Sequence, residues 1–341
     1  MQFFKKYSLC AAVGACLCGS ACAQTVADGV NTIGSSPVEF QSGAYKIAGN
    51  LYLPKGFDAS KKYPAIVVSH PWGGVKEQTA GLYAQRLAQK GFVTLAYDAA
   101  YYGQSEGQPR DTEDPAQRVQ DIRSAVGYLA SRSEVRPDAI GTLGICAGGG
   151  YTLHEAQTDP RVKAVASVAA YDVGGAFRNG ITGSPVTEEQ YQQTLKAAAD
   201  EWNRIAAGDK PTVFKLLPDK KDWTKDTNAF TKEAYSYYRE TRGASPNAKN
   251  LCTLASFVLH AGYYPLEHMD RISPRPVLLI GGEKAESLVF SQQAYDKAAE
   301  PKELMVVPGA THFALYDKEE YVGPVVEKLT KFYGSALNVK D

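Results

Sequence analysis

Residues 139–149 read AIGTLGICAGG, and this stretch decides the fold. The apolar run from 139 to 145 predicts a short buried strand, and a helix is expected directly after it. Cys146 stands between the two in the pattern G-x-C-x-G. Gly144 and Gly148 supply the missing side chains that a cramped strand-to-helix turn requires. Such a turn presents a side chain at the edge of a sheet, so Cys146 is a candidate nucleophile.

Expected strands and helices alternate on both sides of this turn. We expect a hairpin at 38–56, strands at 64–69, 92–97, 162–170, 277–280 and 304–307, and helices at 76–90, 114–132 and 319–333. This alternation predicts the α/β class, with a mostly parallel sheet and helices on both faces. Residues 173–270 break the rhythm, with helical stretches at 188–207 and 229–242 and no clear strand. They are too long for a loop, so we expect an inserted helical cap.

The first 23 residues have the features of a secretory signal peptide. Two lysines precede an apolar stretch that is too short to span a bilayer, and Ala21-Cys22-Ala23 provides a cleavage signature. The folded domain is therefore expected at 24–341, in a periplasmic or secreted protein. The residues before Cys16 make a poor lipoprotein box, which favours export over lipid anchoring. No later segment has the roughly 20 apolar residues that a membrane span needs.

Composition narrows the classes of function. The 341 residues are 44% hydrophobic and 22% charged, with a formal net charge of zero. This fits a globular protein with a full core, and without a basic face nucleic-acid binding is not expected. His260 and His268 lie near Glu267 and Asp270, but their spacing matches no strong ligand motif. We therefore expect no metal and no other cofactor, and the sequence leaves the oligomeric state open.

Cysteine counting sharpens the interpretation of Cys146. Of six cysteines, only Cys146 and Cys252 lie beyond the leader, and an exported protein could join them in a disulfide. A tight turn is a costly place for such a bond, so a free thiol is favoured. A free thiol with a pKa of about 8.5 is only a few per cent ionised at neutral pH. A helix N-terminus shifts that pKa by less than about one unit, so activation requires a histidine.

His312 is the expected partner, because it directly follows the last expected strand in the segment GATHFALYD. The chain order nucleophile, acid, histidine places the acid at an earlier strand end. Glu283 follows the strand at 277–280 after two glycines and is favoured, with Asp172 and Glu286 as alternatives. The backbone N–H of Ala147 is expected to form an oxyanion hole. The second donor is expected from Trp72, in the glycine-rich HPWGG loop.

Four segments together resemble the α/β-hydrolase superfamily: GICAGG at 144–149, HPWGG at 70–74, Asp98 with YYGQSEGQPR at 101–110, and PGATHFALYD at 308–317. The chain is most similar to the dienelactone-hydrolase-like branch with a cysteine nucleophile, which includes fungal polyketide transferases. The resemblance implies an eight-stranded sheet, a cap, and acyl transfer through a thioacyl-enzyme. Cys146 would be the nucleophile and His312 the base. GGEKAES at 281–287 has no aspartate at the family position, so the resemblance does not choose the acid.

These observations predict an exported hydrolase that cleaves or transfers acyl groups of small ester, lactone or thioester substrates. The alternative from another class is a non-catalytic protein that binds a hydrophobic ligand under the cap. A class I amidotransferase also places a cysteine in G-x-C-x-G. There, however, a glutamate stands two residues after the histidine, where this chain has Ala314.

Overall fold

A computed structural model describes residues 34–338 of the chain. The expected eight-stranded, mostly parallel sheet is confirmed, and its strands follow the order β1-β2-β4-β3-β5-β6-β11-β12. The strands are β1 (Ser35–Ser42), β2 (Tyr45–Tyr52), β3 (Tyr63–Ser69), β4 (Val93–Tyr97), β5 (Val135–Ile145), β6 (Val162–Val168), β11 (Val277–Gly282) and β12 (Lys302–Val307). Within this sheet, β2 runs opposite to its neighbours and pairs antiparallel with both β1 and β4, and the β1–β2 pair is the expected hairpin.

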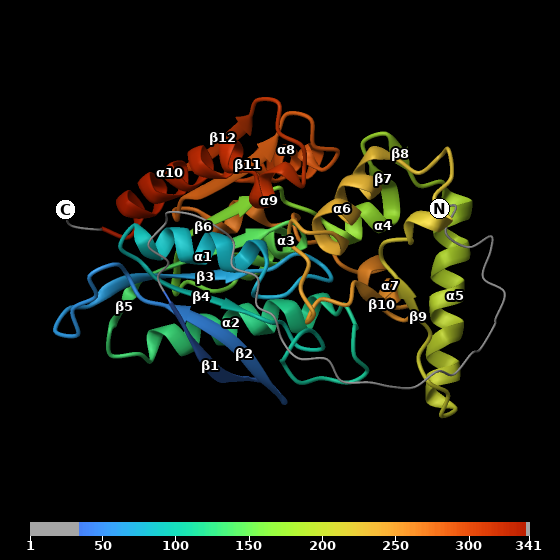
Figure 1. Ribbon diagram of the computed structural model, residues 1–341, viewed down its shortest axis with the longest axis horizontal. Helices are drawn as coiled ribbons and strands as arrows, with labels where there is room; N and C mark the ends of the chain where they lie inside the picture. The colour runs from blue at the N-terminus through green and yellow to red at the C-terminus, as the bar shows by residue number, and fades with distance from the viewer. Residues whose placement is uncertain (1–33, 339–341) are drawn as a thin grey trace. The chain divides into compact units, whose positions relative to one another are not determined.

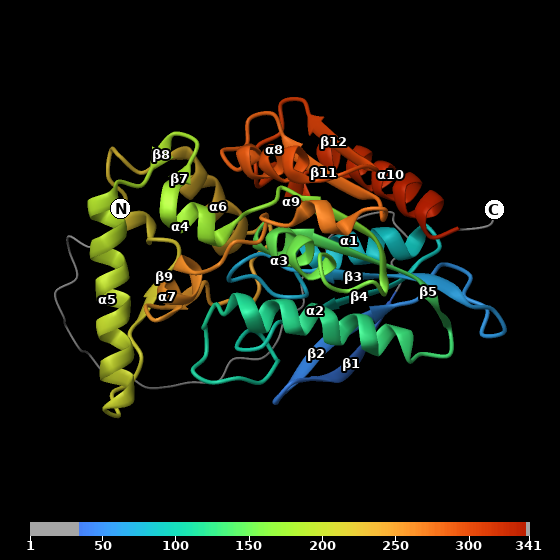
Figure 2. The ribbon, with the colours of Figure 1, turned by 180° about the vertical axis from the view of Figure 1, so that it is seen from behind.

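Helices cover both faces of the sheet, as predicted. Figure 1 shows α1 (Thr79–Gln89) and α10 (Glu319–Ala336) on one face. Figure 2 shows α2 (Pro115–Ala130), α3 (Ala147–Ala156) and α8 (Leu288–Lys297) on the other. The carboxylate of Asp114 begins α2 by accepting hydrogen bonds from two free backbone N–H groups. Because both faces are covered, β4 is buried along its whole length, and its sequence VTLAY is apolar apart from Thr94 rather than alternating.

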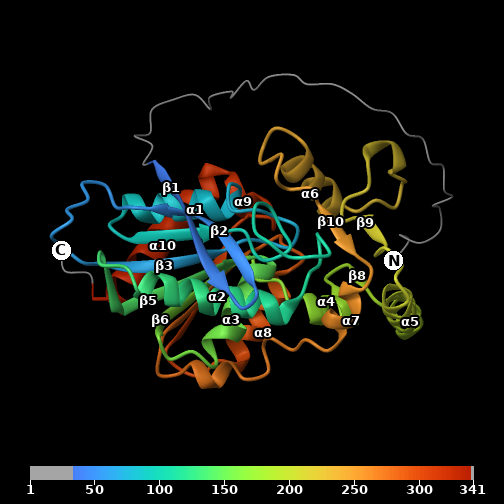
Figure 3. The same cartoon turned by 90° about the horizontal axis from the view of Figure 1, so that it is seen from below.

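We refer to the chain between β6 and β11, where an insertion is expected, as the cap. Figure 3 shows α4, α5, α6, α7, β8, β9 and β10 of this segment gathered at one end of the sheet. The elements are α4 (Val173–Asn179), β7 (Gly180–Ile181), β8 (Ser184–Pro185), α5 (Glu188–Ala206), β9 (Val213–Lys215), η2 (Lys220–Asp222), α6 (Ala229–Arg239), β10 (Leu251–Thr253), α7 (Ser256–Ala261) and η3 (Met269–Ile272). The two longest helices, α5 and α6, agree with the helical stretches expected at 188–207 and 229–242. The expectation of no strand is wrong, because two small two-stranded sheets join the helices.

The predicted leader at 1–23 lies outside the described residues. Within residues 34–338, no helix is both long and apolar enough to cross a membrane. The carboxyl ends of β3, β5, β6, β11 and β12 lead into the segments that carry the candidate residues, which gathers these residues at one edge of the sheet.

Candidate active site

The turn between β5 and α3 has the cramped geometry that its sequence predicts. Cys146 has φ 57° and ψ −124°, which is the left-handed region that side-chain-bearing residues rarely occupy. A Cβ on Gly144 would lie 2.1 Å from the carbonyl oxygen of Gly148. A Cβ on Gly148 would lie 2.4 Å from the carbonyl oxygen of Ser69. Both flanking glycines are therefore required by close backbone approach, and strain is concentrated at Cys146.

The Cys146 sulfur lies in a buried, hydrogen-bonded niche. The residue is 9% exposed, and its sulfur is within hydrogen-bonding reach of the backbone N–H groups of Ala147 and Trp72. The structure thus brings together at the sulfur the two donors expected to form an oxyanion hole. Burial outweighs these contacts and raises the pKa of the Cys146 thiol to about 11, so the resting thiol is protonated. The sequence argument considered only the helix N-terminus and missed this burial.

Buried side chains hold the HPWGG loop that carries Trp72. The backbone N–H of Ala99 donates to His70 Nε2 at 3.0 Å, and the guanidinium of Arg118 donates to the His70 carbonyl oxygen. His70 is fully buried, and burial holds its pKa well below the usual range, so the ring is neutral. From the cap, the Asn250 amide donates to the Gly73 carbonyl oxygen at 3.1 Å. His70 therefore supports the loop rather than reacting.

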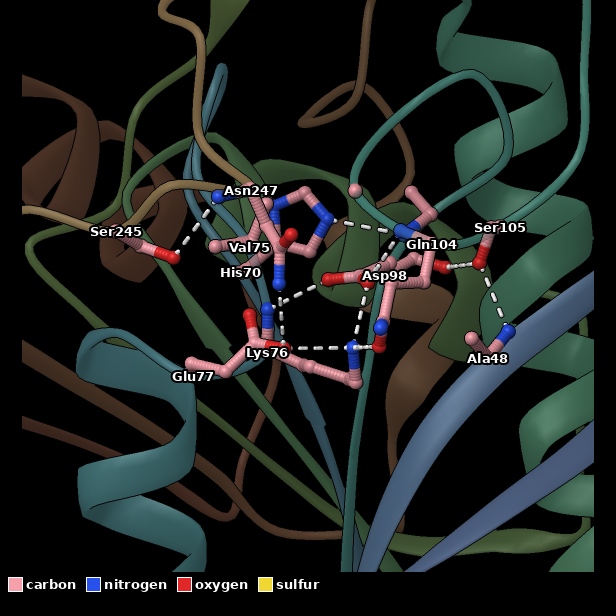
Figure 4. Close-up of polar contacts among 12 residues, drawn as sticks. Ala48, His70, Val75, Lys76, Glu77, Asp98, Gln104, Ser105, Ser245 and Asn247 are labelled. Carbon is pink, nitrogen blue, oxygen red and sulfur yellow. Dashed lines mark hydrogen bonds and ion pairs between the residues drawn. The ribbon is translucent and has the colours of Figure 1, made fainter. Parts of the chain in front are cut away.

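A buried ion pair ties this loop to the loop after β4 (Figure 4). Lys76 Nζ lies 2.8 Å from Asp98 Oδ2 and 2.6 Å from Gln104 Oε1. The Lys76 backbone N–H donates to Asp98 Oδ1 at 2.8 Å. Because the Asp98 carboxylate also accepts the Gln104 N–H at 2.9 Å, both buried charges are fully hydrogen-bonded. The pair fixes the distance between two loops that meet beside the candidate site.

His312 follows β12 and lies fully buried among aromatic rings. Its Nε2 is 3.0 Å from the hydroxyl of Tyr316, which lies in α9 (Ala314–Asp317). Its Nδ1 is 2.5 Å from Ser287 Oγ. The Tyr316 hydroxyl also lies within hydrogen-bonding reach of the Cys146 sulfur. Among the described residues, no hydrogen bond joins Cys146 to His312 directly, and Tyr316 is close to both.

The structure brings none of the three candidate acids to His312. Glu283 is exposed, and its Oε2 accepts the Gly309 N–H at 2.8 Å. Asp172 caps α4 by accepting the Gly175 N–H at 2.8 Å. The half-buried Glu286 makes no hydrogen bond to the imidazole. Burial lowers the pKa of His312 to about 3, so the resting imidazole is neutral.

Sequence reasoning missed Ser287 and Tyr316. Tyr316 carried a usable signal, because it lies four residues after His312 and would share its face in any helical turn. Ser287 carried none, since the expected partner of such a histidine is a carboxylate. The alternative of a disulfide is wrong: Cys146 and Cys252 are both free and buried.

A cavity of about 540 Å³ lies between the cap and α8, within the range of small-molecule sites. Its walls include Asp172, Arg178, Phe290 and Lys297. The Phe290 ring lies 5.3 Å from the ring of Tyr171, whose N–H donates to the Cys146 carbonyl oxygen at 2.9 Å. Phe290 and Tyr171 therefore stand between the cavity and the nucleophile turn. Within residues 34–338, no cluster of three His, Cys, Asp or Glu side chains could hold a metal ion.

Comparisons with known proteins agree with this architecture. A model of the dienelactone hydrolase family matches residues 47–200. The uncharacterized protein YcjY of Escherichia coli K12 is 37% identical over 288 residues, which cover 84% of this chain and 93% of that protein. The crystal structure of the hypothetical protein PA2218 from Pseudomonas aeruginosa matches with a TM-score of 0.83 at 36% identity, over 90% of this chain and 95% of that one. The thiohydrolase aneE of Aspergillus aculeatus is 24% identical over 308 residues, 89% of this chain and 93% of that protein.

Proposed function

Because the chain belongs to the dienelactone hydrolase family and is a hydrolytic enzyme, we propose that it cleaves or transfers acyl groups through Cys146. The observation that carries the proposal is the sulfur on a strained turn beside two backbone N–H groups, those of Trp72 and Ala147. A carbonyl carbon bonded to this sulfur would place its oxygen close to both donors. Fixed donors aimed at developing negative charge are the largest single contribution in many enzymes.

The proposed reaction has two stages. The Cys146 proton passes to His312 as the sulfur attacks the substrate carbonyl, and the carbonyl electron pair moves to the oxygen held by Trp72 and Ala147. The intermediate then collapses: the bond to the leaving group breaks, and the leaving group takes the proton from His312. A thioacyl-enzyme remains. Water attacks it by the same steps and releases a carboxylic acid, whereas an attacking alcohol or amine would receive the acyl group.

The surroundings of His312 restrict the substrate class. The imidazolium formed during the reaction has the Ser287 hydroxyl beside Nδ1 rather than a carboxylate, and it is fully buried. A charged histidine is therefore costly, which favours leaving groups that need little protonation. Thioesters, activated esters and strained lactones meet that condition, and amides do not. The name of the related thiohydrolase is consistent with thioester cleavage.

The leader predicted at 1–23 supports export, so we propose that the enzyme acts on a small molecule in the periplasm or outside the cell. The cavity of about 540 Å³ beside Phe290 is the proposed place for the part of the substrate that is distant from the carbonyl.

One observation favours the alternative of a non-catalytic binding protein. The pKa of the buried Cys146 thiol is about 11, so the resting sulfur is a poor nucleophile. Catalysis then depends on proton removal at the moment of attack, and a protein that lacks this step would only bind its ligand.

The test is turnover of p-nitrophenyl esters, lactones and acyl thioesters by the wild type and by Cys146→Ala. We expect a burst of product, an acyl adduct on Cys146 in intact-protein mass spectra, and a loss of at least about 10³-fold in the variant. Cys252→Ala is the matched control, because Cys252 is the other free buried thiol, and it should retain turnover. Turnover that survives Cys146→Ala would contradict the proposal, and ligand binding without turnover in the wild type would favour the alternative.

A further inference from the structure

The hydroxyl of Tyr316 occupies the position between the nucleophile and the base. It lies 3.0 Å from His312 Nε2 and within hydrogen-bonding reach of the Cys146 sulfur. Tyr316 is fully buried, and the hydroxyl of Tyr238 is also within hydrogen-bonding reach of its own. Any proton that leaves the thiol for the imidazole in this arrangement meets the tyrosine oxygen first.

We propose that the Tyr316 hydroxyl is a catalytic proton relay between Cys146 and His312. This inference rests on the proposed function. As the sulfur attacks the substrate carbonyl, the Cys146 S–H bond breaks and its proton bonds to the Tyr316 oxygen. The Tyr316 O–H bond breaks in the same step, and that proton bonds to His312 Nε2. The tyrosine ends the step neutral, and the reverse transfer delivers a proton to the leaving group.

The hydrogen-bonding capacities of the groups fit this relay. A phenolic hydroxyl can donate one hydrogen bond while accepting another, so Tyr316 can accept from the thiol and donate to the imidazole. Donation to Nε2 requires the tautomer of His312 that carries its proton on Nδ1. That proton has an acceptor, because Ser287 Oγ lies 2.5 Å from Nδ1. The chain Cys146–Tyr316–His312–Ser287 is therefore consistently oriented from end to end.

The two transfers must be concerted. Burial and neighbouring groups raise the pKa of the Tyr316 hydroxyl well above its usual value, so a free phenolate would be strongly disfavoured. A relay in which the oxygen gains one proton as it loses the other avoids that anion. The sulfur then gains charge only as its bond to carbon forms.

Packing fixes the relay oxygen. The Tyr316 ring lies 5.0 Å from the rings of Tyr237 and of Phe313. Arg242, from the cap, donates to both carboxylate oxygens of Asp317 at 2.5 and 3.0 Å, and so holds α9 in place. A side chain held on several sides is preorganised for transfer rather than free to rotate away.

The first test measures the acylation rate of Tyr316→Phe in the burst phase with a p-nitrophenyl ester. We expect a loss of about 100-fold, the range for removal of a proton-transfer group. Tyr333→Phe is the matched control: Tyr333 is fully buried, and its hydroxyl donates to the Thr142 carbonyl oxygen at 2.6 Å, outside the relay. It should stay within about threefold of wild type, as expected for a hydroxyl without a chemical role. Tyr316→Phe acylation within threefold of wild type, or faster, overturns the relay.

Two further measurements make the test specific. In the double variant, Tyr316→Phe should add little to the loss of acylation rate caused by His312→Ala, because both substitutions break the same proton path. Fully additive losses would contradict the relay.

For the wild type, a plot of the acylation rate against the fraction of D₂O in the solvent should be curved, since two protons move in one step. A linear dependence would overturn the relay even if the variant fails to fold. If Cys146→Ala keeps full activity, the proposed function itself fails; if only the relay tests fail, Cys146 catalysis stands.

Discussion

The nucleophile turn and the histidine region are built in different ways. In the turn, the active geometry belongs to the backbone: a left-handed Cys146 between two crowded glycines, with N–H groups as the polar contacts. In the histidine region it belongs to side chains from separate segments, namely Ser287, His312 and Tyr316. The geometry of the turn depends on the path of the backbone and cannot change without moving the chain. The contacts of the histidine depend on single side chains, each of which one substitution can remove. Damage to the turn should therefore affect folding, and damage to the histidine region should affect rate.

The two regions also share a property, since neither contains a charged group that hydrogen-bonds to the reacting atoms. Burial leaves both the Cys146 thiol and the His312 imidazole neutral at rest. The resting site therefore contains no thiolate–imidazolium pair, and charge develops on His312 and on the substrate oxygen only when substrate reacts. The neutral state protects the sulfur, because the thiol form is slower to oxidise than the thiolate.

The largest expected effect comes from breaking the turn with Gly148→Ala. The new Cβ would lie 2.4 Å from the Ser69 carbonyl oxygen, so β3 and α3 must separate. We expect a loss of about 3 kcal/mol in the free energy of unfolding, measured by urea denaturation, and no detectable turnover.

The control for this prediction is Gly334→Ala in α10. A Cβ there meets no atom within 4 Å, so the substitution should stabilise the protein by about 0.5–1 kcal/mol. If Gly148→Ala is as stable as wild type, the turn is more adaptable than its backbone contacts imply.

The second prediction concerns pH and the buried imidazole. The folded pKa of His312, about 3, lies below the unfolded value of 6.5, so the unfolded chain binds the proton first as pH falls. The contribution of neutral His312 is therefore fully present above pH 6.5 and declines as pH falls toward 3. Between pH 7 and 5 the wild type should lose about 2 kcal/mol more unfolding free energy than His312→Gln. Parallel curves for the two proteins would show that the imidazole is more accessible than its burial indicates.

The third prediction separates Ser287 from the acid that the sequence favours. Ser287→Ala removes the hydrogen-bond partner of His312 Nδ1, so the required tautomer is less favoured. We expect kcat to fall about 10-fold with little change in KM, as for one lost orienting hydrogen bond. Glu283→Gln should leave both constants unchanged, because Glu283 contacts the Gly309 N–H and not the histidine. A larger loss in Glu283→Gln than in Ser287→Ala would restore Glu283 as the acid.

The contrast between the backbone turn and the side-chain contacts of the histidine explains which features could be predicted from the sequence. The sheet, its order of strands and helices, and the turn at Cys146 follow from apolar runs and glycine positions, which are local patterns. The oxyanion candidate Trp72 could be placed because its loop directly follows a strand end. The short cap strands β7–β10 span only two or three residues each, too few for a recognisable pattern.

The partners of His312 could not be predicted in the same way. The segments that follow the strand ends contain several polar side chains, and the three-dimensional fold determines which of them hydrogen-bonds to the imidazole. Glu283 was favoured because it directly follows β11, yet its carboxylate binds the Gly309 N–H, and Ser287 lies deeper in the same loop. The neutral state of Cys146 was missed for a related reason, since burial depends on the cap, which is remote in sequence.

The smallest expected effect probes whether the cap supports the backbone donor at Trp72. Asn250 has φ 52°, so Asn250→Gly removes its amide from the Gly73 carbonyl oxygen without straining the chain. Loss of one hydrogen bond of about 1 kcal/mol predicts a fall in kcat of about fivefold, with KM nearly constant because the donor acts on the developing oxyanion. Asn247→Ala is the control, since the half-buried Asn247 donates its amide to Glu77 at 3.2 Å and not to the HPWGG loop. A rise in KM with constant kcat would instead place Asn250 in substrate binding, and equal effects from both variants would mean that the cap does not hold the loop.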